Sequence, residues 1–268
     1  MINKILLKLL VLFLVISIFS CDKKEEKKDY FKDIENKISS MIYNKRYEKT
    51  IKYINSVYFS QEKNISEAEK LKLLFKQAEI KYLYLNSDKV AYKEMKKIFK
   101  NNNNLQSTDK KLYNKLLSYL TTISETIDYQ NFGIFIEKLI KIKKDKNVLY
   151  KYITYLKKEK KLKKLTALLN QKDLFSKEEL ILLKLDLLLL KNNKNILDFI
   201  NKNILQTKNQ KIIDKLNIEK IFYLEQQENI NYKELLGILD LIKSKNYNKF
   251  KKNKEKFYKN RISLYNKK

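Results

Sequence analysis

Residues 47–54 read YEKTIKYI, and this stretch decides the expected fold of the chain. An aromatic residue opens it, and Ile51 and Ile54 follow at the spacing that places side chains on one side of an α-helix. Residues 31–43 show the same periodicity, and residues 44–46 between the two stretches are polar. The sequence therefore predicts two consecutive amphipathic helices that pack against each other.

The same pattern of two helices can be laid down six times between residues 31 and 244. The second helices of these pairs are expected to begin at residues 47, 88, 129, 162, 196 and 232. These positions are 33 to 41 residues apart, close to the period of about 34 residues in tetratricopeptide arrays. We therefore expect a helical-repeat domain over residues 30–245.

The second helix of the first pair also resembles a tetratricopeptide repeat in its residue types. Tyr47 opens it, and Thr50, Ile51 and Ile54 occupy the small and apolar positions that follow. Phe132 and Leu165 stand where the family usually has alanine, and the family's terminal proline is missing. The resemblance implies an all-α fold of antiparallel helix pairs stacked as a tetratricopeptide-like α-solenoid. An irregular helical bundle has the same apolar periodicity and is the alternative.

Composition supports a helical fold and argues against nucleic-acid binding. The chain has 268 residues with no proline and 2 glycines, whereas several strands joined by tight turns normally need both. Its formal net charge is +28, but only Arg46 and Arg261 are arginines among 59 basic residues. Specific readers of nucleic acids usually exploit the planar fork of arginine. We attribute the charge to the residue usage of an A+T-rich genome and expect no nucleic-acid partner.

The N-terminus has the features of a secretory signal peptide over residues 1–20. Two lysines precede an unbroken apolar run at residues 9–16, which is too short to span a membrane. Ser20 then stands before Cys21, the chain's single cysteine. Residues 18–21 resemble a lipobox, the signal read by bacterial lipoprotein-processing enzymes, and bulky Phe19 resembles the relaxed lipoboxes of spirochaetes.

The lipobox resemblance implies cleavage before Cys21 and lipidation of that residue by a diacylglycerol and an N-acyl group such as palmitate. Several acyl chains give stable membrane anchoring. Residues 21–29 continue as a charged tether, which would keep the body near the membrane. We therefore expect a lipid anchor in the cell envelope, at the outer membrane, with its periplasmic or surface location open.

No residue pattern indicates catalysis, a metal site or a cofactor. The chain has no histidine, the commonest general base and metal ligand, and lipid would occupy its cysteine. Two glycines cannot form a glycine-rich phosphate loop. We therefore expect neither enzyme activity nor a bound metal or cofactor.

The tetratricopeptide resemblance implies a concave groove lined by the first helix of each pair. The family's groove positions fall here on Tyr43, Lys76, Tyr84, Tyr150 and Lys157. Such side chains would suit an extended acidic or aromatic peptide, although they are also ordinary surface residues in a chain rich in Tyr and Lys. We expect an interaction module for a protein partner; a surface-exposed lipoprotein that binds host components is the alternative.

Two further segments carry specific expectations. Residues 180–190 read LILLKLDLLLL and predict a helix buried on all sides. Residues 246–268 are strongly basic but keep an apolar helical stripe, which predicts a capping helix over the last pair. The cap would bury Phe257, Tyr258 and Ile262 against Leu239 and Ile242. Docking of the basic segment on anionic lipid is the alternative.

Overall fold

The protein is all-α in the part of the chain that the structure describes. The computed structural model describes residues 30–60 and 65–265. In those residues it contains fourteen α-helices, two short 3-10 helices and no strand. The predicted fold class is thus confirmed. The predicted signal peptide, Cys21 and the tether lie outside the described residues. The described residues form two compact units, which are divided between Lys144 and Asp145.

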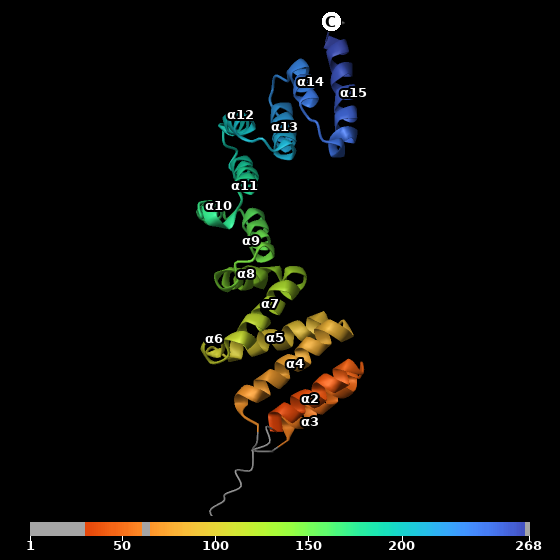
Figure 1. Ribbon diagram of the computed structural model, residues 1–268, viewed down its shortest axis with the longest axis vertical. Helices are drawn as coiled ribbons and strands as arrows, with labels where there is room; N and C mark the ends of the chain where they lie inside the picture. Colours follow the sequence, from red (N-terminus) through yellow and green to blue (C-terminus); the bar gives the residue numbers. More distant parts are fainter. Residues whose placement is uncertain (1–29, 61–64, 266–268) are drawn as a thin grey trace, which may run out of the picture. The chain divides into compact units, whose positions relative to one another are not determined.

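The first unit contains seven of these helices, in which neighbours along the chain pack against each other (Figure 1). They are α2 (Tyr30–Tyr43), α3 (Tyr47–Phe59), α4 (Glu67–Leu85), α5 (Asp88–Asn101), α6 (Leu105–Thr108), α7 (Lys110–Ile127) and α8 (Tyr129–Ile142). The short α6 is an addition to the pair pattern, and it buries Leu105.

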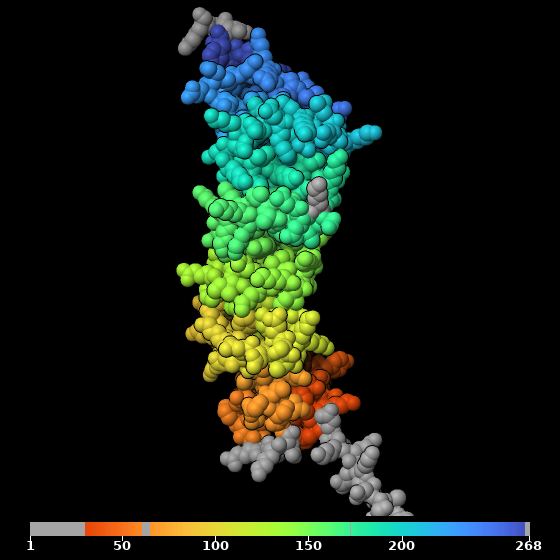
Figure 2. Space-filling model, turned by 90° about the vertical axis from the view of Figure 1, so that its left-hand side faces the viewer, coloured from red at the N-terminus to blue at the C-terminus, as the bar shows by residue number. Residues whose placement is uncertain are grey.

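The second unit continues the same plan. Its elements are α9 (Lys146–Lys158), α10 (Leu162–Leu169), η1 (Lys172–Leu174), α11 (Lys177–Leu190), α12 (Ile196–Gln206), α13 (Gln210–Glu225), α14 (Tyr232–Asp240), η2 (Lys245–Tyr247) and α15 (Asn248–Tyr265). Within each unit the colours of the space-filling view follow one another in bands, so helices close in sequence lie side by side (Figure 2).

The helix pairs have the predicted register. The second helices begin at the six expected residues, which are Tyr47, Asp88, Tyr129, Leu162, Ile196 and Tyr232. Amphipathic periodicity therefore located both the helices and their breaks.

Three apolar core clusters in the described residues are each shared by three consecutive helices. Ile34 of α2, Ile54 of α3 and Leu73 of α4 belong to one such cluster. In the second unit one cluster joins α11, α12 and α13, and another joins α13, α14 and α15. The second helix of a pair is thus packed between its own first helix and the next one. This sharing makes each unit a solenoid-like stack.

The turns inside several pairs use a left-handed residue that is not glycine. Lys45, Asn86, Lys160 and Asn192 have φ angles between 48° and 55°, and they directly follow or lie just beyond the ends of α2, α4, α9 and α11. Glycine adopts this conformation without strain, whereas lysine does not. In this glycine-poor chain, strained lysines and the more tolerant asparagines therefore occupy the left-handed turn positions.

Two expectations about burial were partly wrong. In α11 the side chains of residues 180–189 are buried or half-buried, but Leu190 is 40% exposed. In α15 Tyr258 is fully buried in one cluster with Leu239 and Ile242, but Phe257 is 43% exposed. Adjacent helical residues point about 100° apart, so Phe257 cannot share the buried face that is centred on Tyr258.

The strained turn after α9 leads to a prediction about the stability of the fold. We expect Lys160→Gly to raise the free energy of unfolding by about 0.5–1 kcal/mol, because the strain it relieves exceeds the added entropy of the unfolded chain. The neighbouring Glu159 has φ −82°, so Glu159→Gly has no strain to relieve and should lower stability. Denaturant unfolding of both variants measures the difference, and equal effects of the two substitutions would contradict the argument.

Candidate functional site

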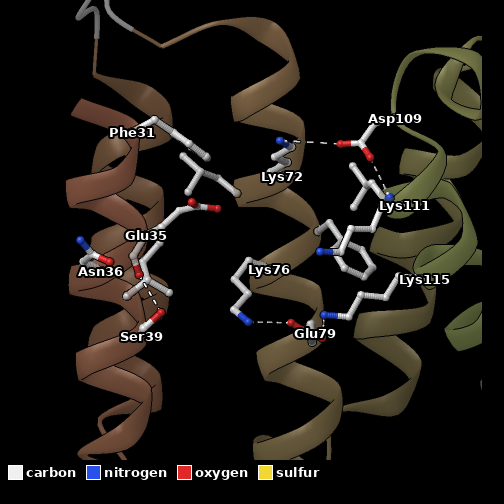
Figure 3. A pocket seen from close by; sticks show the side chains of 14 residues that line it. Phe31, Glu35, Asn36, Ser39, Lys72, Lys76, Glu79, Asp109, Lys111 and Lys115 are labelled. Carbon is white, nitrogen blue, oxygen red and sulfur yellow. Dashed lines mark hydrogen bonds and ion pairs between the residues drawn. The ribbon is translucent and has the colours of Figure 1, made fainter. Parts of the chain in front are cut away.

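An open groove lies between α2, α4 and α7, the first helices of the first three pairs. Its volume is about 560 Å³, and its lining comes from these helices and from Asp109 at the start of α7. Figure 3 shows side chains from all three helices pointing into it. The tetratricopeptide resemblance implied a groove formed by first helices, and the first unit contains one.

The floor of the groove is apolar and its rim is charged. Phe31, Leu73, Phe75 and Leu112 line it with side chains that are at most 8% exposed. The charged lining residues are Glu35, Lys72, Lys76, Glu79, Asp109, Lys111 and Lys115. An apolar floor with a few oriented polar groups is the usual composition of a ligand-binding surface.

Glu79 is the buried centre of the charged rim. Its side chain is only 5% exposed, and it accepts hydrogen bonds from the Lys76 and Lys115 ammonium groups at 2.8 and 2.6 Å. The Tyr119 hydroxyl of α7 donates to the same carboxylate at 2.9 Å. Figure 3 shows Lys76 and Lys115 reaching Glu79 from opposite sides. One carboxylate thereby joins α4 to α7.

These contacts determine the charge state of Glu79. Burial acts to raise the pKa of its carboxyl, but the hydrogen bonds and charges of Lys115 and Lys76 outweigh burial and lower that pKa below its ordinary value. Burial and the bond to Glu79 both raise the pKa of Tyr119. At neutral pH the cluster therefore holds an ionised carboxylate and a neutral phenol.

A second carboxylate, Asp109, orders the other end of the groove. Its Oδ1 accepts from the backbone N–H of Leu112 at 2.9 Å and so caps α7. Its Oδ2 lies 3.7 Å from the Lys72 ammonium. Lys111 is exposed, and within the described residues it forms no ion pair. Lys111 is therefore the rim cation that remains available to a ligand.

The first unit contains three of the five residues that the sequence analysis assigned to a groove. Lys76 lines the groove. Tyr43 does not line it, and this side chain at the end of α2 is 87% exposed. The Tyr84 ring stacks on the Tyr47 ring of α3, with centroids 4.5 Å apart and planes 5° apart. Tyr84 therefore holds α3 against α4.

The other two residues both lie on α9 and both bind α11. The Tyr150 hydroxyl donates to Glu179 Oε1 at 2.9 Å, and Lys157 forms an ion pair with Asp186. The backbone N–H of Ser176 and the Lys146 ammonium hold the pKa of Glu179 at about 2. Tyr150 and Lys157 therefore connect two consecutive first helices of the second unit.

The contact at Glu79 recurs, and we call it the carboxylate clasp. In each clasp a glutamate of one first helix binds a lysine and a tyrosine that lie four residues apart on a neighbouring helix. Three clasps occur in the described residues: Glu79 with Lys115 and Tyr119, Glu179 with Lys146 and Tyr150, and Glu225 with Lys254 and Tyr258. Residues four apart share one side of a helix, so both donors reach the same acceptor.

Sequence reasoning found the lysine and tyrosine character of this surface but missed its acidic partners. Glu79, Glu179 and Glu225 received no role from periodicity. The Lys-x-x-x-Tyr spacing is a possible signal, but it has little specificity in a chain with 59 basic residues and 19 tyrosines. The partner of each pair depends on how neighbouring helices are aligned, which periodicity does not encode.

In residues 30–60 and 65–265 no group of three or more His, Cys, Asp or Glu side chains is placed to hold a metal ion. No helix in these residues is both long and apolar enough to cross a membrane.

In comparisons with known proteins, no family model, no curated protein and no solved structure matches the chain. The groove must therefore be interpreted from its own geometry.

The Glu79 clasp makes a prediction about stability and pH. We expect Glu79→Gln to lower the free energy of unfolding by about 1–3 kcal/mol at neutral pH, because it removes charged hydrogen bonds from two lysines. The exposed Glu35 on the same groove serves as the control, and Glu35→Gln should change stability by less than about 0.5 kcal/mol.

Because the pKa of Glu79 is lower in the folded chain than its ordinary value of 4.5, the ionised carboxylate stabilises the fold above pH 4.5. This contribution to the free energy of unfolding is lost as pH falls through the lower pKa of the folded chain. The difference between wild type and Glu79→Gln should therefore shrink below pH 4.5, as measured by denaturant unfolding across pH. A difference that is constant down to acid pH would contradict an ionised Glu79.

Proposed function

We propose that this protein is a lipid-anchored, non-enzymatic interaction module of the bacterial cell envelope. In this proposal the groove between α2, α4 and α7 binds an extended segment of a protein partner. The groove's apolar floor beside a charged rim, in which Lys111 has no ion pair within the described residues, is the observation that carries the proposal. The proposal includes no catalytic step, metal or cofactor.

The groove's charges indicate what kind of segment would bind. Lys76 and Lys115 both pair with Glu79, and Lys72 lies 3.7 Å from Asp109, so these three lysines already have carboxylate partners in the fold. Lys111 remains to pair with a carboxylate, while the buried rings and aliphatic side chains of the floor would accept an apolar side chain. A segment with one acidic and one apolar side chain would satisfy both.

The membrane anchor is supported by sequence alone. Ser20 and Cys21 follow an apolar run of signal-peptide length, and the chain has no second cysteine. Residues 21–29 are nearly all charged and would separate the lipid from α2. The groove opens beside α2, the first helix after this tether, and we propose that the partner is also an envelope protein at the outer membrane.

The anchor is tested by Cys21→Ala. Because the cysteine sulfur would carry the diacylglycerol, this variant should remain an uncleaved precursor or release its body into the soluble fraction. Partitioning between detergent and aqueous phases, with metabolic labelling by palmitate, measures the change, and Ser20→Ala serves as a matched control that should still be lipidated. Normal labelling of Cys21→Ala would contradict the anchor.

The groove is tested by photo-crosslinking in cells that produce the full-length protein. A photoreactive residue at Asn36 or Ser39 faces the groove and leaves Lys111 in place, and one at Lys97 of α5 is also exposed but does not line it. We expect both groove positions to capture the same partner and Lys97 to capture none of it. Adding Lys111→Glu should weaken capture from Asn36 by about tenfold, the effect of losing one charged hydrogen bond.

Capture of the same protein from Lys97, or capture from Asn36 that is unchanged by Lys111→Glu, would contradict binding in the groove. The result is independent of the anchor, because each arm compares variants that share the same N-terminus.

A further inference from the structure

The basic residues of α15 are divided between two sides of the helix. Lys254 binds both carboxylate oxygens of Glu225 at 2.7 Å, and Lys251 donates to the carbonyl oxygen of Ile242 at 2.7 Å. Tyr258 is fully buried on the same side and donates to Glu225 at 2.6 Å. These three residues attach α15 to α13 and to the end of α14.

The opposite side of α15 carries a different set of lysines, which we call the outer stripe. Lys249, Lys252 and Lys256 are exposed, and they form no ion pair or hydrogen bond within the described residues. Spacings of three and four place them in one line along the helix. Lys259 extends the line and binds Glu255 of its own helix at 2.5 Å. The line is about 15 Å long at 1.5 Å per residue.

Exposed apolar side chains border the outer stripe. Phe257 and Leu264 are 43% and 58% exposed, and their seven-residue spacing places them together along one flank of the stripe. The Arg261 guanidinium lies 5.2 Å from the Phe257 ring centroid. A helix with a lysine line and adjacent exposed apolar groups has the composition of helices that lie in a membrane interface.

We propose that the outer stripe of α15 docks on an anionic lipid surface, with Phe257 and Leu264 entering the interface beside it. From Lys245 to Arg261 the chain has eight basic residues and Glu255 as its single acid, so the charge is complementary to such a surface. Lipid headgroups require only positive charge near a plane, and lysines supply it. The bidentate arginine fork that favours nucleic acids is largely missing.

This docking goes beyond the partner groove and does not require the Cys21 lipid. It is also compatible with the predicted cap, because Lys251, Lys254 and Tyr258 occupy the side that packs and the outer stripe occupies the other.

The test measures binding to vesicles of phosphatidylcholine with and without phosphatidylglycerol. A chain that begins at residue 21 and carries Cys21→Ser keeps every described residue and lacks the apolar segment that would itself bind lipid. We expect binding to the anionic vesicles alone, and high salt should remove most of it but leave the smaller part that apolar insertion contributes. Lys249→Glu, Lys252→Glu and Lys256→Glu together should weaken it by at least roughly a hundredfold, because the loss of each lysine near an anionic surface costs about a fivefold factor and the new carboxylates add repulsion.

A matched control exists on α5. Lys89, Lys93 and Lys97 are exposed and spaced by four residues, and their replacement by Glu changes the net charge by the same amount. We expect this control to retain most of the binding, and Leu264→Ser to weaken the part that salt does not remove. Unchanged thermal unfolding of each variant verifies that the fold is intact.

Three results would overturn the proposal. The first is that the parent chain does not bind anionic vesicles. The second is that the α5 and α15 variants lose vesicle binding equally, and the third is that the chain binds a DNA duplex as tightly as it binds the vesicles. The second result would assign the binding to net charge, and the third to a general affinity for polyanions.

Discussion

The alignment of α4 with α7, of α9 with α11 and of α13 with α15 depends on the carboxylate clasp. A carboxylate that is taken out of water needs several charged or strong hydrogen-bond donors, and removing one leaves a large desolvation cost. Glu79 is nearly fully buried and receives two lysines and a tyrosine. Apolar contacts between helices tolerate small shifts along the axis, whereas a clasp is satisfied only when donor and acceptor helices are aligned. The clasps at Glu179 and Glu225 are more exposed and align their helices by the same geometry.

This constraint changes the meaning of the high lysine content. The net charge of +28 would suggest a cationic binding surface everywhere, but several lysines in the groove and on the inner side of α15 are already bound to carboxylates or to a backbone carbonyl oxygen. Lys76, Lys115 and Lys254 each contribute to the fold through a carboxylate. The lysines that remain for partners are those without such contacts, such as Lys111 and Lys249. In this chain a binding surface is therefore identified by lysines that lack a carboxylate partner, and not by the number of lysines near one another.

Apolar periodicity explains why the helices could be predicted from the sequence and why the polar contacts between them could not. A 3.6-residue apolar period identifies the buried side of each helix and its ends, and this was sufficient to locate the starts of all six second helices. It does not encode which polar side chain meets which across two helices. Tyr84 was assigned to a groove but stacks on Tyr47, and Tyr150 binds Glu179. Lys76 was placed in the groove because the repeat resemblance, and not its own pattern, marked that position.

The two explanations of the basic C-terminus concern different sides of one helix. A helix packed along one edge buries roughly a third of its circumference, and Tyr258 with Lys254 and Lys251 occupies that third in α15. The cap thus fixes the rotation of α15 about its axis, and this rotation determines which residues remain outside. If Phe257 were buried in place of Tyr258, α15 would be rotated by about 100° about its axis, and the Tyr258 hydroxyl would be turned away from Glu225. The exposure of Phe257 is therefore a consequence of the clasp at Glu225.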